Sequence, residues 1–299
     1  MMVLANSEKA QSAIEFITTY GWMMLTLIAA VSILYYLGYF SPLTYAPRLS
    51  PGGCQVVRPI GSVAQLQGNC DSEMPQFVGY FNSTSQYSWI AVDRVVLPNG
   101  QSSGTITAWI NPQTVQGDAG YTGIVRIDGE SCPGHGFLLS LQGSSGRPSM
   151  ATWCNDYVPS GGPTVNYNSW NFVAVTVQGT TATLYVNGQS ESGSLSSGDP
   201  MSLVSGTCTQ NLSIGSTDCP GRMFYGMIAD VQVYNTSLSS ADVNSIYSEG
   251  VGGTPIDLNY LSGWWPLNGN ANDYSGNGYN GNSFAVSYRS SWANSYTPP

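Results

Sequence analysis

The sequence has few charged residues for its length. Only 8% of its 299 residues are Asp, Glu, Lys or Arg, against about 25% in an average soluble protein. Lys9 is the only lysine, so the chain after it relies on arginine for positive charge, and the net charge is −9. An acidic chain without a basic segment lacks the electrostatic footprint of nucleic-acid binding. We therefore expect no nucleic-acid partner.

The sequence also has few of the residues that form a zinc site, namely histidine and closely spaced cysteine pairs. His135 is the only histidine and no C-x-x-C occurs, so a zinc site made of Cys and His is not expected. Six cysteines allow many pairings. We favour three sequential bridges because each closes a short local loop: Cys54–Cys70, Cys132–Cys154 and Cys208–Cys219. Disulfides indicate an oxidising exterior, which also suits the N-glycosylation sequons at Asn82, Asn211 and Asn235.

Paired carboxylates are missing as well. Glycoside hydrolysis needs two carboxylates that flank the scissile bond, but Glu130, Glu191 and Glu249 stand apart in the sequence and no E-x-D-x-x-E-like run occurs. A single histidine makes a Ser/His/Asp set unconvincing. We therefore predict that the chain is not an enzyme.

A long apolar segment lies near the N-terminus. The 25 residues from Phe16 to Phe40 carry no charge, and as a helix they extend roughly 37 Å, more than the ~30 Å of a bilayer's hydrocarbon core. Aromatic residues lie near both ends, as in interfacial belts: Tyr20, Trp22, Tyr35, Tyr36 and Tyr39. Lys9 precedes the segment, which places the N-terminus in the cytoplasm. A plain signal anchor with one span is one interpretation.

Two features favour a different interpretation. Glu15 lies at the apolar edge, where a charge is expensive. The charged and small residues precede the apolar run, whereas a secretory signal places its cut site after it. The stretch "KAQSAIEFITTYGW", continuing to "ILYYLGYF", resembles archaeal type IV pilin-like precursors with class III signal peptides.

This resemblance implies a processing site and an assembly role. A prepilin peptidase would cut between Ala10 and Gln11, so that residues 1–10 form a cleaved leader. Residues 11–41 would form a helix that spans the membrane before assembly and lies in the filament core afterwards. The new α-amino group of Gln11, largely protonated near neutral pH, would pair with Glu15 of a neighbouring subunit and neutralise a carboxylate in an apolar bundle.

After a Pro- and Gly-rich linker at residues 42–53 the pattern becomes that of short strands. Alternating or β-branched runs separated by Gly, Asn and Ser predict an antiparallel β-sandwich or jelly roll; the clearest are 104–110, 122–127, 135–142, 170–178 and 181–188. Gly179-Thr180 marks a tight hairpin. Residues 239–250 predict a helix with Ser239 as N-cap. Its expected inward face is Ala241, Val243, Ile246 and Tyr247.

The later part of the chain resembles the laminin-G-like, concanavalin A-like sandwich family. The matching residues are Gly226, Ile228, Asp230, Val231, Val233 and Tyr234. The fold expected is thus mainly β, with a long N-terminal hydrophobic helix followed by an extracellular sandwich over residues 54–299. "GWWPLNGNANDYSGNGYNG" (263–281) resembles the strand and loop that open such a domain, yet here it comes last. We infer a circular permutation, in which the C-terminal segment 263–290 completes the sandwich beside the last strand; a truncated second copy is the alternative.

The same segment predicts a calcium site. Oxygen donors crowd into ten residues: Asn268, Asn270, Asn272, Asp273, Ser275 and Asn277. Calcium takes six to eight oxygen ligands, and the resemblance implies a calcium at Asp273, with Asn277 and Asp230 as further ligands. Alternatively, these residues only shape a turn.

The leading functional prediction is a structural subunit of an archaeal type IV pilus-like surface filament. Its partners would be identical subunits, the prepilin peptidase, the membrane before assembly, and glycans or another cell surface that the sandwich binds. The alternatives are a monomeric membrane-anchored lectin and a secreted hydrolase. Tryptophans suit either sugar contact or a core, and the sequence leaves both roles open for Trp89, Trp109, Trp153, Trp170, Trp264 and Trp265.

Overall fold

The computed structural model divides the chain into two compact units, residues 1–50 and 51–299. It describes residues 20–21, 23–33, 54–57, 63–66, 74–82, 87–93, 97, 102–113, 121–128, 136–142, 145–151, 156–157, 161–194, 211–216 and 223–299. In the first unit the described residues are helical, inside the predicted helix 11–41. No helix in this described part of the chain is long and apolar enough to cross a membrane.

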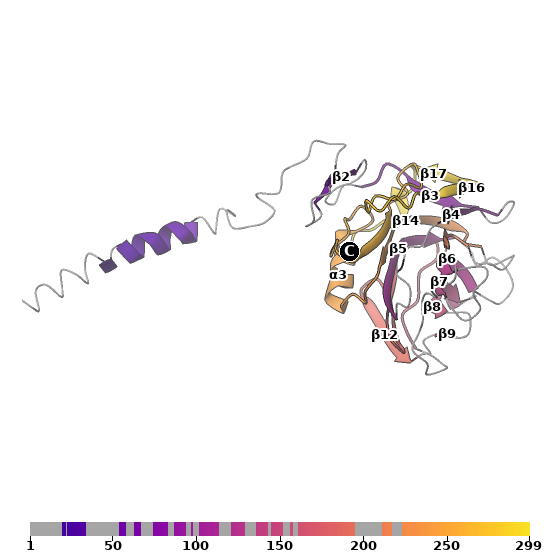
Figure 1. The fold of residues 1–299 in the computed structure, drawn as a ribbon, viewed down its shortest axis with the longest axis horizontal. Coiled ribbons are helices and arrows are strands. Elements are labelled where there is room, and N and C mark those ends of the chain that lie inside the picture. The colour runs from indigo at the N-terminus through magenta and orange to yellow at the C-terminus, as the bar shows by residue number, and fades with distance from the viewer. Residues whose placement is uncertain are drawn as a thin grey trace, which may run out of the picture. The chain divides into compact units, whose positions relative to one another are not determined.

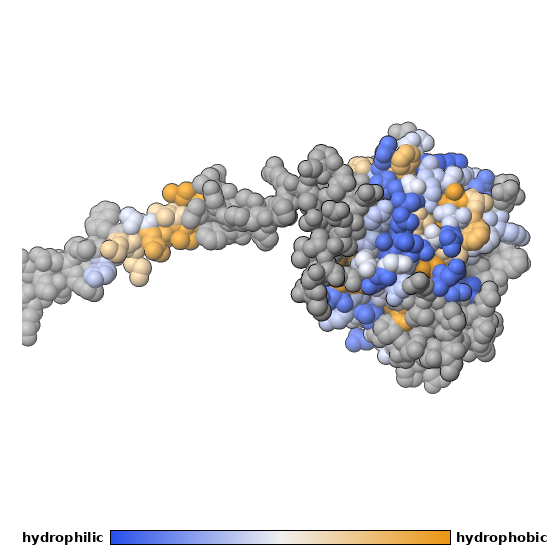
Figure 2. All heavy atoms as spheres, turned by 45° about the horizontal axis from the view of Figure 1, so that its top comes forward, coloured by the Kyte–Doolittle hydropathy of each residue, from blue (hydrophilic) through white to orange (hydrophobic). Residues whose placement is uncertain are grey.

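The described helix of the first unit exposes its apolar side chains. Exposed fractions run from 46% to 65% for Met23, Met24, Leu25, Leu27, Ile28, Val31 and Ile33, and Figure 2 shows hydrophobic residues along this helix. A helix that is apolar on all sides is stable only when a membrane or other helices cover it.

The second unit is an antiparallel β-sandwich of two sheets, as predicted (Figure 1). Sheet I has the order β12-β11-β10-β5-β14-β3-β17, with β15 paired to β14 as well. Its strands are β12 (Gln189–Ser194), β11 (Thr181–Val186), β10 (Asn171–Gln178), β5 (Ser103–Pro112), β14 (Gly226–Tyr234), β3 (Val78–Phe81), β17 (Val286–Arg289) and β15 (Leu261–Trp265).

Sheet II has the order β16-β4-β13-β6-β7-β8-β9. Its strands are β16 (Asn282–Phe284), β4 (Trp89–Val92), β13 (Asn211–Ile214), β6 (Tyr121–Asp128), β7 (Phe137–Gln142), β8 (Arg147–Ala151) and β9 (Asp156–Tyr157). A separate antiparallel pair consists of β1 (Cys54–Val57) and β2 (Val63–Leu66).

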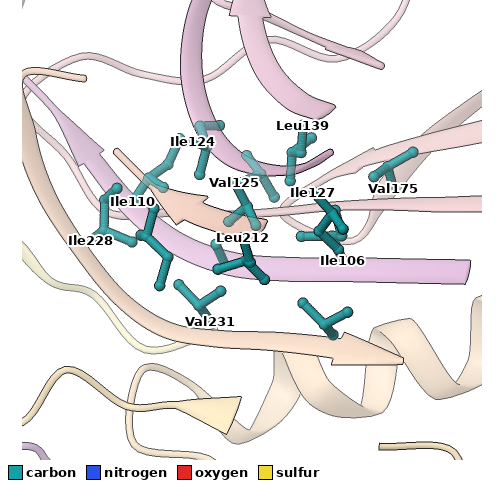
Figure 3. Packing of buried hydrophobic residues seen from close by; sticks show 14 of the residues in the cluster. Ile106, Ile110, Ile124, Val125, Ile127, Leu139, Val175, Leu212, Ile228 and Val231 are labelled. Carbon is teal, nitrogen blue, oxygen red and sulfur yellow. The ribbon is translucent and has the colours of Figure 1, made fainter. Parts of the chain in front are cut away.

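One hydrophobic core fills the space between the sheets. Branched aliphatic side chains from both sheets meet there (Figure 3), among them Ile106, Ile110, Ile124, Val125, Ile127, Leu139, Val175, Leu212, Ile228 and Val231. Trp265 lies in this core and is fully buried. Alternation along each strand puts every second side chain on this inner side, which leaves an outer face on each sheet.

A second apolar layer covers the outer face of sheet I. Helix α3 (Ser240–Glu249) begins at the predicted N-cap Ser239, whose hydroxyl accepts from the Asp242 N–H in a capping box. Val243 and Ile246 are buried against this face, whereas Ala241, which we expected to face inward, is exposed. The prediction for Ala241 is wrong because it lies in the first turn of the helix, at the margin of the covered face.

The C-terminal residues complete this cover. The short 3-10 helix η2 (Ala293–Ser295) follows Trp292, and the indole N–H of Trp292 donates to the Pro75 carbonyl at 2.9 Å. The indole of Trp170 donates to the Trp292 carbonyl at 3.2 Å. Two segments far apart in sequence thus hold the chain's last residues against sheet I.

Both sheets contain strands from the C-terminal segment. β15 pairs with β14 over Val231–Tyr234, as expected for a strand that returns beside the last one, and β3 pairs with β14 over Gly226–Ile228. β16 then joins sheet II and β17 joins sheet I, with Ala285 between them at φ +50°. The chain therefore crosses from one sheet to the other and closes one side of the sandwich.

Candidate functional site

The outer face of sheet II is lined by a row of side chains in register. The core side of the sheet is formed by Ile90, Ile214, Val125, Leu139 and Met150. Their neighbours along each strand turn outward and form one row across six strands, here called the transverse row: Asn282, Ala91, Ser213, Arg126, Leu138 and Ala151. All six are exposed or half-buried, so the row forms a mixed polar and apolar surface.

An aromatic pair stands at the β16 end of this face. Phe284 on β16 is the register partner of Trp89 on β4, and their rings stack with centroids 4.7 Å apart and planes 15° from parallel. Phe284 is 44% exposed, and Tyr87, two residues before Trp89, is 57% exposed. Three aromatic rings therefore lie near one edge of sheet II and contact solvent.

The exposed part of the face is limited on the β7–β8 side. Ser140 and Ser149 lie on strands β7 and β8, two residues from Leu138 and Ala151 respectively, and their hydroxyls are 2.7 Å apart and buried. The open part of the face thus runs from β16 to β6, beside the aromatic pair. Figure 2 shows hydrophilic residues with smaller hydrophobic areas among them on the described surface of the sandwich turned to the viewer.

Asp273, the centre of the predicted calcium site, accepts hydrogen bonds from the protein on both carboxylate oxygens. One oxygen receives the backbone N–H groups of Trp264 (3.0 Å) and Ser275 (2.9 Å). The other receives the Tyr279 N–H at 2.9 Å and the Ser275 hydroxyl at 2.9 Å. Asp273 therefore fixes the loop after β15, as a turn-shaping residue does.

Asn277 and Asp230 have comparable structural roles. The amide of Asn277 donates to the carbonyls of Leu261 at 3.2 Å and Ser262 at 2.8 Å. Asp230 lies in β14 between the segments that pair with β3 and β15, at φ +48°. Protein N–H groups therefore donate to the carboxylates of both Asp273 and Asp230, and calcium at Asp273, Asn277 and Asp230 stays a prediction. Within the described residues there is also no group of three or more His, Cys, Asp or Glu placed to hold a metal.

Asp230 belongs to a buried polar network that the sequence did not reveal. Both of its oxygens accept from the Gln232 amide at 3.0 Å, and one accepts from the Trp264 indole N–H at 2.7 Å. The Tyr234 hydroxyl donates to Gln232 Oε1 at 2.7 Å. Burial raises the pKa of the Asp230 carboxyl to about 7, although the hydrogen bonds from Gln232 and Trp264 oppose the shift.

The three sequons differ in exposure. Asn211, the first residue of β13, is exposed, whereas Asn82 after β3 and Asn235 after β14 are half-buried. The processing residues Ala10 and Gln11 and the assembly residue Glu15 lie outside the described residues. So do all cysteines except Cys54, which begins β1, and the three disulfides stay a prediction.

The structure separates the roles of most tryptophans. Trp109, Trp170, Trp264 and Trp265 are buried, Trp89 is half-buried on the outer face of sheet II, and Trp153 lies outside the described residues. The sequence signal that singles out Trp89 is the alternation in "YSWIAV", where it occupies the phase opposite to Ile90 and Val92. Phe284 carried no such signal because its partner lies almost two hundred residues away.

The two-sheet sandwich is the architecture of a concanavalin A-like lectin domain. Residues 83–244, which are 162 of the 299 residues, match the laminin-G type family described as the concanavalin A-like lectin/glucanases superfamily. Because the match covers more than half of the chain, the chain belongs to this superfamily. Strands β15, β16 and β17 lie beyond the matched residues and still complete both sheets. No curated protein matches the sequence significantly.

One solved structure supports this fold with a TM-score above 0.5, and two others are similar at lower scores. A proposed carbohydrate-binding protein from Bacteroides ovatus matches with a TM-score of 0.53 at 17% identity, over 78% of this chain and 64% of that one. The heptameric SAP-like pentraxin of Limulus polyphemus matches with a TM-score of 0.48 at 13% identity, over 72% of this chain and 95% of that one. The CBM40 of a Ruminococcus gnavus IT-sialidase matches with a TM-score of 0.39 at 15% identity, over 60% of this chain and 96% of that one.

Proposed function

We propose that this chain is a glycan-binding subunit of an archaeal type IV pilus-like surface filament, with its helix in the filament core and its sandwich displayed outward for adhesion. The observation that carries the glycan-binding part is the aromatic cluster on the outer face of sheet II, in which Tyr87 and Phe284 are exposed and Trp89 is half-buried. Aromatic rings pack against the apolar faces of sugars, and the nearby amide and hydroxyl groups of Asn282 and Ser213 can bond sugar hydroxyls. Membership of a lectin-type superfamily supports this use of the face.

The filament part rests on the first unit. Its described helix exposes apolar side chains that need a partner, and burying one Leu, Ile or Val side chain contributes about 1.5–3 kcal/mol. Identical helices in a filament core would bury this surface, as a membrane does before assembly. The leader 1–10 would be removed by the prepilin peptidase, and the N-terminal amine of Gln11 would pair with Glu15 of a neighbour. The precursor would lie in the cytoplasmic membrane with its N-terminus inside, and the mature protein at the cell surface.

Glycan binding is tested with a glycan array and titration of the best ligand. Tyr87→Ala should weaken binding at least about tenfold, or about 1.4 kcal/mol, because a solvent-exposed ring that contacts sugar is removed. Tyr260→Ala is the matched control, since Tyr260 is similarly exposed, at 51% against 57%, but precedes β15 of sheet I. Equal binding by the two variants would refute the assigned face.

The same ligand is used to test whether the chain hydrolyses glycans and whether its binding depends on calcium. We expect no hydrolysis products after long incubation, and no loss of binding after chelation, because Asp273 and Asp230 already accept protein N–H groups. Loss of binding on chelation, with recovery on adding calcium, would restore the calcium site of Asp273, Asn277 and Asp230.

Filament assembly is tested by N-terminal sequencing and electron microscopy of cell-surface material. The proposal requires a mature chain that begins at Gln11, filaments built from it, and loss of filaments in Glu15→Gln. The alternative is a monomeric, membrane-anchored lectin, which would begin at Met1 or Met2, form no filaments and be insensitive to the Glu15 substitution.

A further inference from the structure

We propose that Asn211 is a glycosylated residue and that its glycan lies over the outer face of sheet II, where it covers the aromatic cluster. This inference rests on the proposed sugar-binding role of that face. Of the three sequons, Asn211 is the one to which we assign a glycan. The consequence is that the chain's own glycan would occupy the outer face of sheet II.

Asn211 is the best candidate for glycosylation among the three sequon asparagines, because it is the exposed one. A glycan attaches at the side-chain amide nitrogen, which must be reachable. Asn235 is half-buried, its side-chain oxygen is buried, and its backbone N–H donates to the Tyr260 carbonyl at 2.9 Å. Asn82 is half-buried where β3 ends. Asn211 is exposed at the first position of β13.

Strand alternation points Asn211 toward the outer face of sheet II. Leu212 and Ile214 are buried in the core, so Asn211 and Ser213 face the other way. Ser213, the third residue of the sequon, is in the transverse row and pairs with Ala91 on one side and Arg126 on the other. The sequon is therefore part of the proposed binding face.

The aromatic pair lies within reach of a short oligosaccharide. Asn211 is two residues from Ser213 in one direction, and Trp89 is two residues from Ala91, the partner of Ser213, in the other. At about 3.3 Å per residue and about 4.8 Å between strands, the two Cα atoms are about 14 Å apart. The first few sugars attached to Asn211 span this distance along the sheet and would pack on Trp89 and Phe284.

The attachment step uses a lipid-linked oligosaccharide as donor. The Asn211 amide nitrogen forms a bond to C1 of the first sugar, and the bond between that C1 and the lipid phosphate oxygen breaks. The lipid phosphate leaves with the electron pair, and the amide nitrogen loses one proton. The Ser213 hydroxyl completes the sequon that the transferase recognises.

The first measurement is mass spectrometry of the full chain purified from its native cells. We expect a glycan at Asn211. The second is hydroxyl-radical footprinting, in which Trp89 and Phe284 should become severalfold more oxidised in Asn211→Gln and in Ser213→Ala than in the wild type. Ser213→Thr keeps the sequon and should keep the wild-type protection, and Asn82→Gln is the control for loss of a sequon elsewhere.

Two results would overturn the inference. One is an unmodified Asn211; the other is a modified Asn211 whose removal leaves the oxidation of Trp89 and Phe284 unchanged. Footprinting needs no added ligand, so this test stands even if the glycan array finds no ligand and the proposed function fails. If external glycans do bind, Asn211→Gln should bind them more tightly than the wild type.

Discussion

The two sheets of the sandwich share one core but differ on their outer faces. Sheet I is covered by helix α3 and the C-terminal residues, which bury Trp109, Phe172 and Trp264 in a second apolar layer. On sheet II no described helix covers the outer side, and the aromatic residues there remain partly in contact with solvent. Apolar side chains near solvent cost stability unless something else covers them. The difference separates a face that is buried for stability from the face to which we assign sugar binding.

The two outer faces also differ in the number of rings that each aromatic side chain contacts. In the cover of sheet I, Trp109 contacts Phe172, Tyr247 and Tyr296 with ring centroids 5.6–5.9 Å apart. On sheet II, the only ring contact among the described residues of β4 and β16 is the stack of Trp89 on Phe284. A ring held on several sides contributes mainly to stability, whereas a ring held on one side keeps a surface for a ligand.

The largest expected effect comes from removing the centre of the sheet I cover. Trp109→Ala should lower the free energy of unfolding by about 3–5 kcal/mol, because it leaves a cavity in a fully packed layer. The measurement is chemical denaturation of the folded chain. The indole N–H of Trp109 has no hydrogen-bond partner in the described part of the chain, so Trp109→Phe should cost much less. On sheet II, Trp89→Ala should cost about 1–2 kcal/mol, and equal losses for Trp109→Ala and Trp89→Ala would remove the distinction between the faces.

The second largest effect is the pH dependence of the free energy of unfolding that comes from Asp230, the buried carboxyl in the sheet I cover. Because burial raises the pKa of Asp230 from 3.8 to about 7, the native protein binds the proton more tightly than the unfolded chain. Unfolding releases this proton between about pH 4 and pH 7, so the group lowers the free energy of unfolding as the pH rises through that window. The decrease is at most about 4 kcal/mol, since one pKa unit corresponds to about 1.4 kcal/mol.

Asp230→Asn isolates this contribution. The variant should show a flatter dependence of unfolding free energy on pH between 4 and 7 than the wild type, in denaturation curves taken at several pH values. Asp257→Asn is the control, because it also removes a carboxyl but one that is exposed. Asp257 lies on the same side of the sandwich, where its charge contributes to the raised pKa of Tyr234. An unchanged slope in Asp230→Asn would mean that the carboxyl keeps an ordinary pKa in the fold.

Local patterns in the sequence predicted much of sheet I. The hairpin at Gly179-Thr180 forms as expected, with Gln178 paired to Thr181 and Gly179 at φ +59°. Ser239 caps its helix. The return of β15 beside β14 was also predicted, from the resemblance of "GWWPLNGNANDYSGNGYNG" to an opening strand. A turn, a helix cap and a strand pattern each involve only a few neighbouring residues. They can therefore be recognised from one sequence.

The aromatic face of sheet II and the buried network were not predicted, because they depend on contacts between distant segments. Phe284 meets Trp89 only after the chain has passed from β15 of sheet I to β16 of sheet II, just before Ala285 leads it back to sheet I. Asp230 was assigned to calcium because its type and family position suggested a ligand. In the structure its carboxylate accepts from the Gln232 amide and the Trp264 indole, and the register shift in β14 beside it was shown by no local pattern.

The smallest expected effect is the coupling between Trp89 and Phe284. Stacked aromatic pairs contribute about 0.5–1.5 kcal/mol beyond the area they bury, so a double-mutant cycle of Trp89→Ala and Phe284→Ala should give a coupling energy in this range. Trp170 and Trp292 form the matching pair in the sheet I cover, with centroids 5.6 Å apart, and because the Trp170 indole also donates to the Trp292 backbone, their coupling should be at least as large. A coupling near zero for Trp89 and Phe284 would show that the stack does not hold β16 on sheet II.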